Sequence, residues 1–225
     1  MDGNGRWANR RGLPRLAGHR AGAQALERVV RCAAELGIEV LTVYGFSTEN
    51  WRRPATEVRG IMHILVEFLR LKTRDLVREG VRLRYVGDVS ALPAAARAEL
   101  ERSVRATAQG RRLTLVLALN YGGRWEIVDA ARRLAARAAR GELRPEEIDE
   151  ALFGRELATG EFPPPDLIVR PGGELRLSNF LLWGAAYSEI VATDTLWPDF
   201  DGDTLRWAVA EFGRRERRFG GLPGR

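Results

Sequence analysis

Residues 113–123 read LTLVLALNYGG, an almost continuous apolar run that ends in an asparagine, a tyrosine and two glycines. An apolar run of this length with glycine at its end predicts a buried strand that passes into a turn. The residues that follow, from Trp125 to about Arg140, predict a helix. A buried strand followed at once by a helix is typical of α/β folds.

The same alternation extends in both directions along the chain. Further buried strands are expected at 38–46, 81–86, 166–170 and 190–193. Further helices are expected at 16–36, 54–79, 93–109, 146–152 and 203–217. This alternation predicts an α/β fold with a mostly parallel central sheet and helices on both faces. The 225 residues fit one domain spanning positions 1–225, with no repeat or linker to divide it.

The composition narrows the class of protein. Hydrophobic residues make up 45% of the chain and charged residues 29%, as in globular proteins with a sizeable core. The single cysteine, Cys32, excludes an intrachain disulfide and suits a reducing compartment. No apolar run approaches the roughly 18 residues that span a bilayer, and the polar start is not a signal segment. We therefore expect a cytoplasmic protein.

The charge balance favours an anionic partner. The net charge is +6, and Lys72 is the only lysine among 36 basic residues. Such a balance leaves nucleic acid, anionic lipid and phosphorylated substrates open. The motifs at the expected strand ends favour the last of these.

The chain begins MDGNGRW, so that a carboxylate, two glycines, an amide and a guanidinium fall within residues 2–6. Glycine lets backbone N–H groups approach an oxyanion closely. Arg6 can hold phosphate oxygens in a fork, and Asp2 can bind a Mg²⁺ ion that bridges them. Arg15 and His19 follow at the start of the first expected helix, where the helix dipole favours anions. These residues fit a diphosphate cradle; a flexible terminus with a surface histidine fits them too.

A second anion site is expected directly after the strand at 166–170. The segment RPGGELRLSN places Arg170 and Arg176 on either side of a Gly-Gly bend, followed by Ser178. Arginine suits bidentate phosphate contacts better than lysine. Glu189, at the start of the next expected strand, is either a metal-binding carboxylate or a surface acid.

The loop FSTENWRRP, residues 46–54, follows another expected strand. It carries more polar and aromatic residues than an N-cap of the next helix requires. Because ligands of open α/β sheets bind beyond the carboxyl ends of the strands, this loop, the 120–123 turn and the 170–179 segment should line one site. The helix at 54–79 has an apolar face wide enough either to pack on the sheet or to line an apolar cavity. Together these features predict two phosphorylated substrates with apolar tails.

In these blocks the sequence resembles the cis-prenyltransferase (isoprenyl transferase) family, most closely its bacterial undecaprenyl diphosphate synthases. The matching blocks are 1–8, 18–19, 46–54, 120–125, 170–183, 197–200 and 214–221. The resemblance implies a Mg²⁺-dependent transferase that condenses isopentenyl diphosphate with an allylic diphosphate, usually farnesyl diphosphate. Its implied product is a long-chain cis-polyprenyl diphosphate such as undecaprenyl diphosphate, and its implied fold contains a hydrophobic tunnel.

The resemblance also implies a role for individual positions. Asp2 and Glu189 match metal-binding carboxylates, Asp2 being essential for catalysis, and Asn50 matches a proposed proton acceptor. The allylic diphosphate site is matched by Gly3, Asn4, Gly5, Arg6, Trp7, Arg15 and His19. The mobile substrate loop is matched by Ser47, Thr48, Glu49, Trp51 and Arg53. The isopentenyl diphosphate clamp is matched by Arg170, Arg176, Leu177 and Ser178.

The resemblance further implies a homodimer in which Arg218 reaches the partner subunit's site, and peripheral membrane contact for product release. Two departures from the family pattern stand out. Leu175 occupies a position where some relatives have a polar residue or histidine, so any metal or phosphate contact from that side chain is lost. The family's apolar strand before the first motif is missing ahead of Met1, from which we expect an unpaired interior sheet edge and a poorly held Asp2.

A non-catalytic alternative is a basic binding module or an inactive partner subunit. An inactive subunit should have lost Asp2 or the arginine clamp, and both are intact. A nucleic-acid binder should interleave stacking aromatics with basic residues. Here the tryptophans lie mostly within the blocks of resemblance, so we expect no nucleic-acid partner.

Overall fold

Strands and helices alternate along the computed structural model, which describes residues 1–216. In chain order they are α1 (Asn4–Asn9), α2 (Arg15–Glu35), β1 (Val40–Ser47), α3 (Ala55–Arg78), β2 (Val81–Val86), α4 (Ala94–Ala106), β3 (Leu113–Tyr121), α5 (Gly123–Ala139), α6 (Glu150–Glu156), β4 (Leu167–Pro171), β5 (Glu189–Thr193) and α7 (Gly202–Gly213). Every strand and helix expected from the sequence is present, with bounds shifted by a few residues. Helix α1 has no counterpart in the sequence pattern, because glycine and asparagine are poor helix formers.

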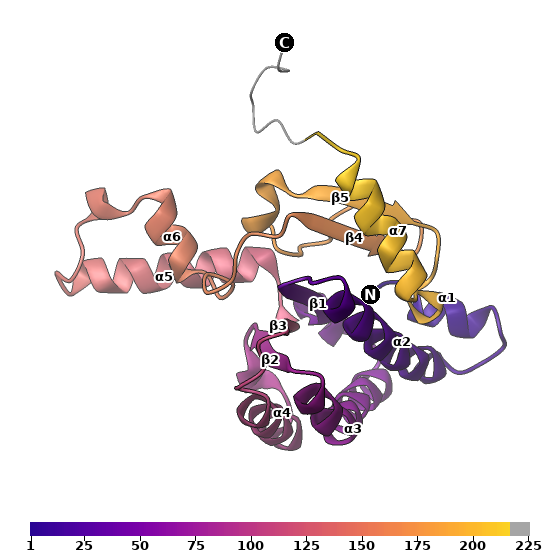
Figure 1. Cartoon of the computed structure of the whole chain (residues 1–225). Coiled ribbons are helices and arrows are strands. Elements are labelled where there is room, and N and C mark those ends of the chain that lie inside the picture. The colour runs from indigo at the N-terminus through magenta and orange to yellow at the C-terminus, as the bar shows by residue number, and fades with distance from the viewer. Residues whose placement is uncertain (217–225) are drawn as a thin grey trace, which may run out of the picture.

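β3 lies at the centre of a three-stranded parallel sheet with the order β1-β3-β2, and β4 pairs with β5 in parallel. The predicted parallel α/β architecture is therefore confirmed. The expected sheet is divided into two parts, since no strand within residues 1–216 hydrogen-bonds to both. Helices α2, α3 and α4 lie against the β1-β3-β2 sheet, while α7 packs on β4, β5 and α2 (Figure 1).

Alternate residues of β3 face two different sets of side chains. Leu115 and Leu117 belong to the main core beneath α2, α3 and α4. Val116 and Ala118 point to the opposite face, where they pack with Leu181 in a smaller apolar cluster. Both faces of β3 are thus buried, which explains its almost continuous apolar sequence.

Backbone preferences set where the elements start and bend. Helices α2, α3 and α4 begin directly after Pro14, Pro54 and Pro93, since proline's missing N–H costs nothing at a helix start. In β1 the pairing with β3 shifts by one residue at Gly45. Such a bulge bends a strand, and this one lies just before the polar loop that begins at Ser47.

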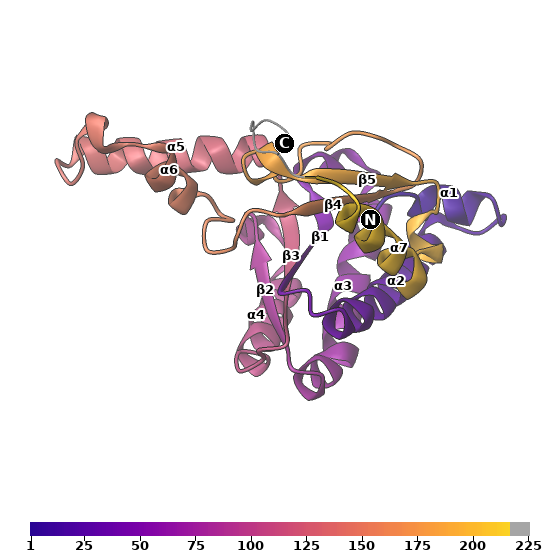
Figure 2. The same ribbon diagram turned by 45° about the horizontal axis from the view of Figure 1, so that its top comes forward.

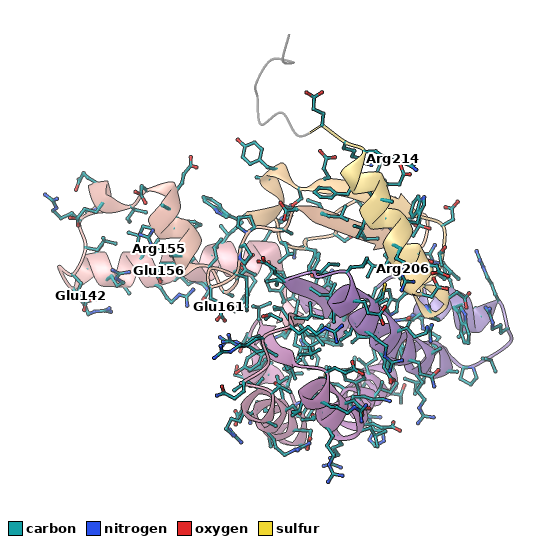
Figure 3. All side chains as sticks on the ribbon, viewed as in Figure 1. Glu142, Arg155, Glu156, Glu161, Arg206 and Arg214 are labelled. Atoms are coloured by element: carbon teal, nitrogen blue, oxygen red, sulfur yellow. The ribbon has the colours of Figure 1, made fainter. Side chains whose placement is uncertain are left out.

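Helices α5 and α6 form an arm that projects from the rest of the molecule (Figures 1 and 2). An ion pair of 2.6 Å between Arg137 and Glu156 joins the two helices. The arm's surface carries further charged side chains, including Glu142 and Arg155 (Figure 3). Within residues 1–216, no helix combines the length and apolarity needed to cross a bilayer.

Candidate functional site

Asp2 lies between the guanidinium groups of Arg6 and Arg170, which are far apart in the sequence. Its Oδ2 accepts a hydrogen bond from the Arg170 guanidinium at 2.9 Å, and its Oδ1 lies 3.4 Å from the Arg6 guanidinium. Partial burial by itself would raise the pKa of the Asp2 carboxyl, but the hydrogen bond from Arg170 and the two positive charges lower it below its usual value. Asp2 is therefore ionised at neutral pH, and its side chain is 35% exposed.

The first residues are held by the turn after β5, which contains a short 3₁₀ helix, η5 (Trp197–Asp199). The Trp197 N–H donates to the Asp2 carbonyl at 2.9 Å. Gly3 has a φ of +102°, and a Cβ there would lie 2.8 Å from Leu196 Cδ2. Only glycine combines this φ with so close an approach. Asp2 is thus well held, contrary to expectation, because η5 fixes its carbonyl and Leu196 packs against the glycine that follows it.

Arg170, near the end of β4, organises the loop that follows. Its NH1 donates to the Arg176 carbonyl at 2.8 Å and to Ser178 Oγ at 3.0 Å. Arg6 reaches the same loop and donates to the Gly172 carbonyl at 2.8 Å. The Arg170 Nε is buried without a hydrogen-bond partner, so a donor remains for a ligand or water. This arrangement of two guanidinium groups suits the oxygens of a diphosphate.

A second cationic group surrounds Glu57 in the first turn of α3. Arg15 donates to its carboxylate through Nε and NH2 at 3.0 and 3.2 Å. His19 Nε2 and Arg53 NH1 each lie 3.1 Å from Glu57 Oε1. Burial would raise the pKa of Glu57, but these partners outweigh it and lower the pKa to about 2. Glu57 therefore holds together three of the side chains predicted to bind substrate.

Helix α1 connects the two cationic groups. The Arg15 guanidinium lies against Gly5, where a Cβ would be 2.4 Å from NH1. Asn4 Nδ2 is 3.5 Å from His19 Nδ1. Burial is the largest influence on the pKa of His19 and lowers it, so the imidazole is neutral at pH 7. Its contacts assign Nε2–H to Glu57 and leave Nδ1 to accept from Asn4.

The predicted substrate loop contains a short 3₁₀ helix, η1 (Thr48–Arg52), directly after β1. Asn50 closes the start of η1, because its Oδ1 accepts a hydrogen bond from the Ser47 N–H at 3.1 Å. Thr48 lies against Gly122 at the start of α5, where a Cβ would be 2.9 Å from the Thr48 Oγ1. The loop after β1 and the turn after β3 therefore meet, as their shared place at strand ends predicted.

Two asparagines fasten η1 to its surroundings. Trp51 Nε1 donates to Asn120 Oδ1 at 2.8 Å. Glu49 accepts a hydrogen bond from Asn179 Nδ2 at 2.8 Å, and this bond lowers the pKa of Glu49 despite the opposing effect of burial. The loop after β4, to which Asn179 belongs, thus joins the other two strand-end segments.

An apolar cavity of about 100 Å³ opens between α2, α3, β1 and β3. Asn4 and His19 stand at its lining beside apolar side chains. Those side chains include Leu26, Phe46, Ile61, Ile64, Leu65 and Phe68. The wide apolar face of α3 therefore both packs in the core and lines a cavity, so the two interpretations left open by the sequence hold together.

Glu189 does not join Asp2 within the described chain. Glu189 is paired with Leu167, whereas Arg170 is paired with Ala192. The three intervening steps of β5 span about 10 Å. The Glu189 carboxylate forms an ion pair of 2.7 Å with Arg215.

Asp2 by itself fits a Mg²⁺ ligand. Mg²⁺ at phosphate sites is commonly held by one or two carboxylates together with substrate oxygens. Asp2 is ionised, partly exposed and flanked by guanidinium groups that suit a diphosphate. Among residues 1–216, no three His, Cys, Asp or Glu side chains gather into a ligand set made by one chain alone, so substrate oxygens and water would complete the set around Asp2 in a single described chain.

The remaining predicted residues lie at the margin of the site. The Arg176 side chain is 59% exposed, and its guanidinium pairs with Glu174 at 2.5 Å. Leu177 contributes its carbonyl to the loop by accepting from the Phe180 N–H at 3.2 Å. Trp7 Nε1 donates to the Asp199 carboxylate at 2.7 Å. Arg218 lies outside the described residues.

Glu57, Asn120 and Asn179 hold the site together, yet sequence reasoning assigned none of them a binding role. The position of Glu57, one turn into the helix after the arginine-rich loop, predicts that it pairs with that loop, and its ion pair with Arg53 at 3.1 Å confirms this. Asn120 and Asn179 have φ values of +47° and +63°. Asparagine tolerates this conformation better than most residues, and the place of Asn120 at the end of the apolar run of β3 is a weak sign of it.

Known proteins resemble this chain over almost its whole length, including the residues of the site. The family described as "Putative undecaprenyl diphosphate synthase" matches residues 1–220. An isoprenyl transferase from Heliobacterium mobile is 52% identical over 222 residues, which cover 99% of this chain and 85% of that protein. A farnesyl-diphosphate-specific ditrans,polycis-undecaprenyl-diphosphate synthase from Salmonella paratyphi A is 48% identical over 98% of this chain and 88% of its own length. The crystal structure of lavandulyl diphosphate synthase from Lavandula x intermedia, in complex with dimethylallyl diphosphate, superposes with a TM-score of 0.96 at 38% identity, covering 98% of this chain and 95% of that one.

Proposed function

Because the chain belongs to the undecaprenyl diphosphate synthase family of isoprenyl transferases, we propose that it condenses isopentenyl diphosphate with an allylic diphosphate such as farnesyl diphosphate. The product is a long-chain cis-polyprenyl diphosphate such as undecaprenyl diphosphate. The observation that carries the proposal is the convergence of Arg6 and Arg170 on Asp2, beside a second cationic group held by Glu57. Two substrates that each carry a diphosphate need two such groups.

We assign the allylic diphosphate to the start of α1. The first N–H groups of a helix have no partners within the helix, and here Arg15 lies against Gly5 and His19 lies beside Asn4. The apolar cavity next to Asn4 and His19 accepts the hydrocarbon tail. Negative charge grows on the leaving diphosphate as its C–O bond breaks, and preorganised donors stabilise that charge.

We assign isopentenyl diphosphate to the clamp formed by Arg170, Arg176, Leu177 and Ser178. The unpartnered Nε of Arg170 supports this assignment, because a bound phosphate oxygen would satisfy it. The double bond of isopentenyl diphosphate attacks the allylic carbon, the allylic diphosphate leaves, and a proton is lost to form the new cis double bond. Asn50 is the proposed acceptor of that proton, and its Oδ1 keeps a second lone pair beyond the one used by Ser47.

Asp2 is the residue proposed to hold Mg²⁺. The bound ion would neutralise diphosphate charge as a Lewis acid. Glu189 remains a proposed metal carboxylate, but its place at the far end of β5 means that this chain alone does not bring it to Asp2.

We further propose a homodimer that works in the cytoplasm and contacts the membrane peripherally to release its product. Exposed Trp183 and Tyr187, just before β5, supply apolar surface that a second copy could cover.

The direct test is Asp2→Ala, assayed with farnesyl diphosphate, labelled isopentenyl diphosphate and Mg²⁺. We expect elongation to fall by at least 10²–10³-fold, the typical cost of losing one charge-stabilising group, while circular dichroism shows an unchanged fold. Elongation near the wild-type rate would contradict the proposed metal-binding role of Asp2. A wild-type protein that binds both diphosphates without joining them would instead favour the non-catalytic binding module.

A further inference from the structure

The segment after the arginine clamp is folded against ordinary backbone preference. Ser178, Asn179 and Leu181 have φ values of +50°, +63° and +49°. Positive φ costs residues other than glycine on the order of 1 kcal/mol or more, and such strain persists only where surrounding contacts impose it. The contacts of Asn179 are therefore of particular interest.

Every polar group of the Asn179 side chain is used. Its Oδ1 accepts from the Arg124 N–H at 2.8 Å, and its Nδ2 donates to Glu49 Oε1 at 2.8 Å. Its backbone carbonyl accepts from the Gly123 N–H at 2.7 Å. These partners assign the amide orientation, since only the oxygen can face an N–H and only the nitrogen can face a carboxylate. Asn179 therefore joins the start of α5 to η1.

The same segment leads directly to the clamp. Ser178, one peptide bond away, accepts a hydrogen bond from Arg170 at 3.0 Å. Arg170 in turn donates to Asp2 at 2.9 Å. A continuous path of contacts thus runs from Glu49 on the substrate loop, through Asn179 and Ser178, to the group around Asp2. On this path, only the hydrogen bond between Glu49 and Asn179 connects η1 to the clamp.

We propose that Asn179 is a positioning residue whose hydrogen bond to Glu49 locks η1 against the clamp. We call this contact the lock. Its expected effect on turnover rests on the proposed function, because it assumes that the clamp binds isopentenyl diphosphate. Its effect on the loop itself needs no substrate. Asparagine suits the position because it tolerates the left-handed backbone and offers an acceptor to α5 and a donor to η1 on one short side chain.

The pair allows a test by exchange of donor and acceptor. Asn179→Asp keeps the acceptor for Arg124 but sets two carboxylates face to face, which breaks the lock. Glu49→Gln alone preserves an acceptor for Asn179. In the double variant the new amide of residue 49 can donate to the new carboxylate of residue 179, which restores the hydrogen bond with its direction reversed.

Hydrogen exchange of residues 47–53, measured without substrate, reports the lock itself. We expect Asn179→Asp to speed exchange there by about 10-fold or more, given the usual strength of hydrogen bonds to charged groups. Glu49→Gln should stay near wild type, and the double variant should return most of the protection. Unchanged exchange in Asn179→Asp, or no recovery in the double variant, would overturn the proposal.

Steady-state kinetics on the same four proteins test the consequence for catalysis. We expect Asn179→Asp to raise KM for isopentenyl diphosphate by about 10-fold, with a smaller change for farnesyl diphosphate, and the KM of the double variant to return to that of Glu49→Gln alone. A purely structural role would lower the folded fraction without this split or this recovery. If the wild type elongates nothing while the exchange pattern holds, the proposed function fails and the lock stands.

Discussion

Glu57 is the residue on which the cationic group beside α1 depends. Arg15 and Arg53 come from two separate segments, and their like charges would repel one another without a shared anion, while the neutral His19 adds a hydrogen bond to the same carboxylate. The Glu57 carboxylate contacts all three and is only 8% exposed. It therefore preorganises groups that the proposed allylic diphosphate would otherwise have to assemble on binding.

This role predicts a stability that depends on pH. The pKa of Glu57 is about 2 in the folded chain, against 4.5 when unperturbed. A depressed folded pKa adds stability above pH 4.5 that is lost as pH falls toward 2, at most on the order of 3 kcal/mol. Urea unfolding of wild type and Glu57→Gln should differ by up to this amount at pH 7 and by less than half of it at pH 3. A difference that stays constant with pH would contradict the assignment.

At the scale of the element, α1 shows how a helix can start from a glycine that helix propensity disfavours. Gly3 turns the chain into the helix with a left-handed φ, pressed against Leu196. The first turn then leaves N–H groups without partners in the helix, beside Arg15 and His19. The bulge at Gly45 acts similarly on β1, because it bends the strand where the substrate loop begins.

Comparing alanine variants of Gly3 and Gly12 separates the effect of backbone strain from the effect of close packing. Gly3 and Gly12 both have positive φ, but a Cβ at Gly12 would meet nothing within 4 Å. Each Gly→Ala change should cost about 1–2 kcal/mol of backbone strain. Only Gly3→Ala should also displace α1. Because a misplaced binding group usually slows an enzyme strongly, we expect this variant to lower kcat/KM by about 10-fold or more. Equal activity of the two variants would show that the contact with Leu196 does not position the site.

At the scale of the whole molecule, the site forms where distant segments pack together. The cavity lies between α2, α3, β1 and β3, and the turn after β5 closes the molecule against the first residues. The size of the cavity should then limit the length of the hydrocarbon tail that the proposed reaction can build.

Ala23, on α2, lines this cavity. Ala23→Leu adds three carbon atoms to a space of about 100 Å³, so we expect shorter polyprenyl products with the first condensation retained. Chromatography of labelled products would measure the shift. Ala136→Leu, on the exposed surface of α5, is the matched control and should leave the product distribution unchanged. Products of wild-type length from Ala23→Leu would exclude this cavity as the tail site.

Much of the architecture could be predicted from local pattern. Apolar periodicity and the placement of proline and glycine located the strands and the long helices, because these signals act within a few residues. The same reasoning missed α1, whose start depends on packing against Leu196 and not on helix propensity. The sequence pattern also predicted that the polar segments after the strands would meet, since the carboxyl ends of parallel strands share one edge of a sheet.

By itself, then, the sequence determined the alternation of strands and helices, the motif residues and the anionic class of ligand, because backbone preference and side-chain chemistry are local properties. Only the tertiary structure decided that the sheet divides in two, that η5 holds Asp2, that Glu57 gathers two arginines and a histidine, and that Glu189 pairs with Arg215. Each of these depends on which of many distant segments pack against one another. Such contacts join residues as far apart as 2 and 197, and no short stretch of sequence specifies them.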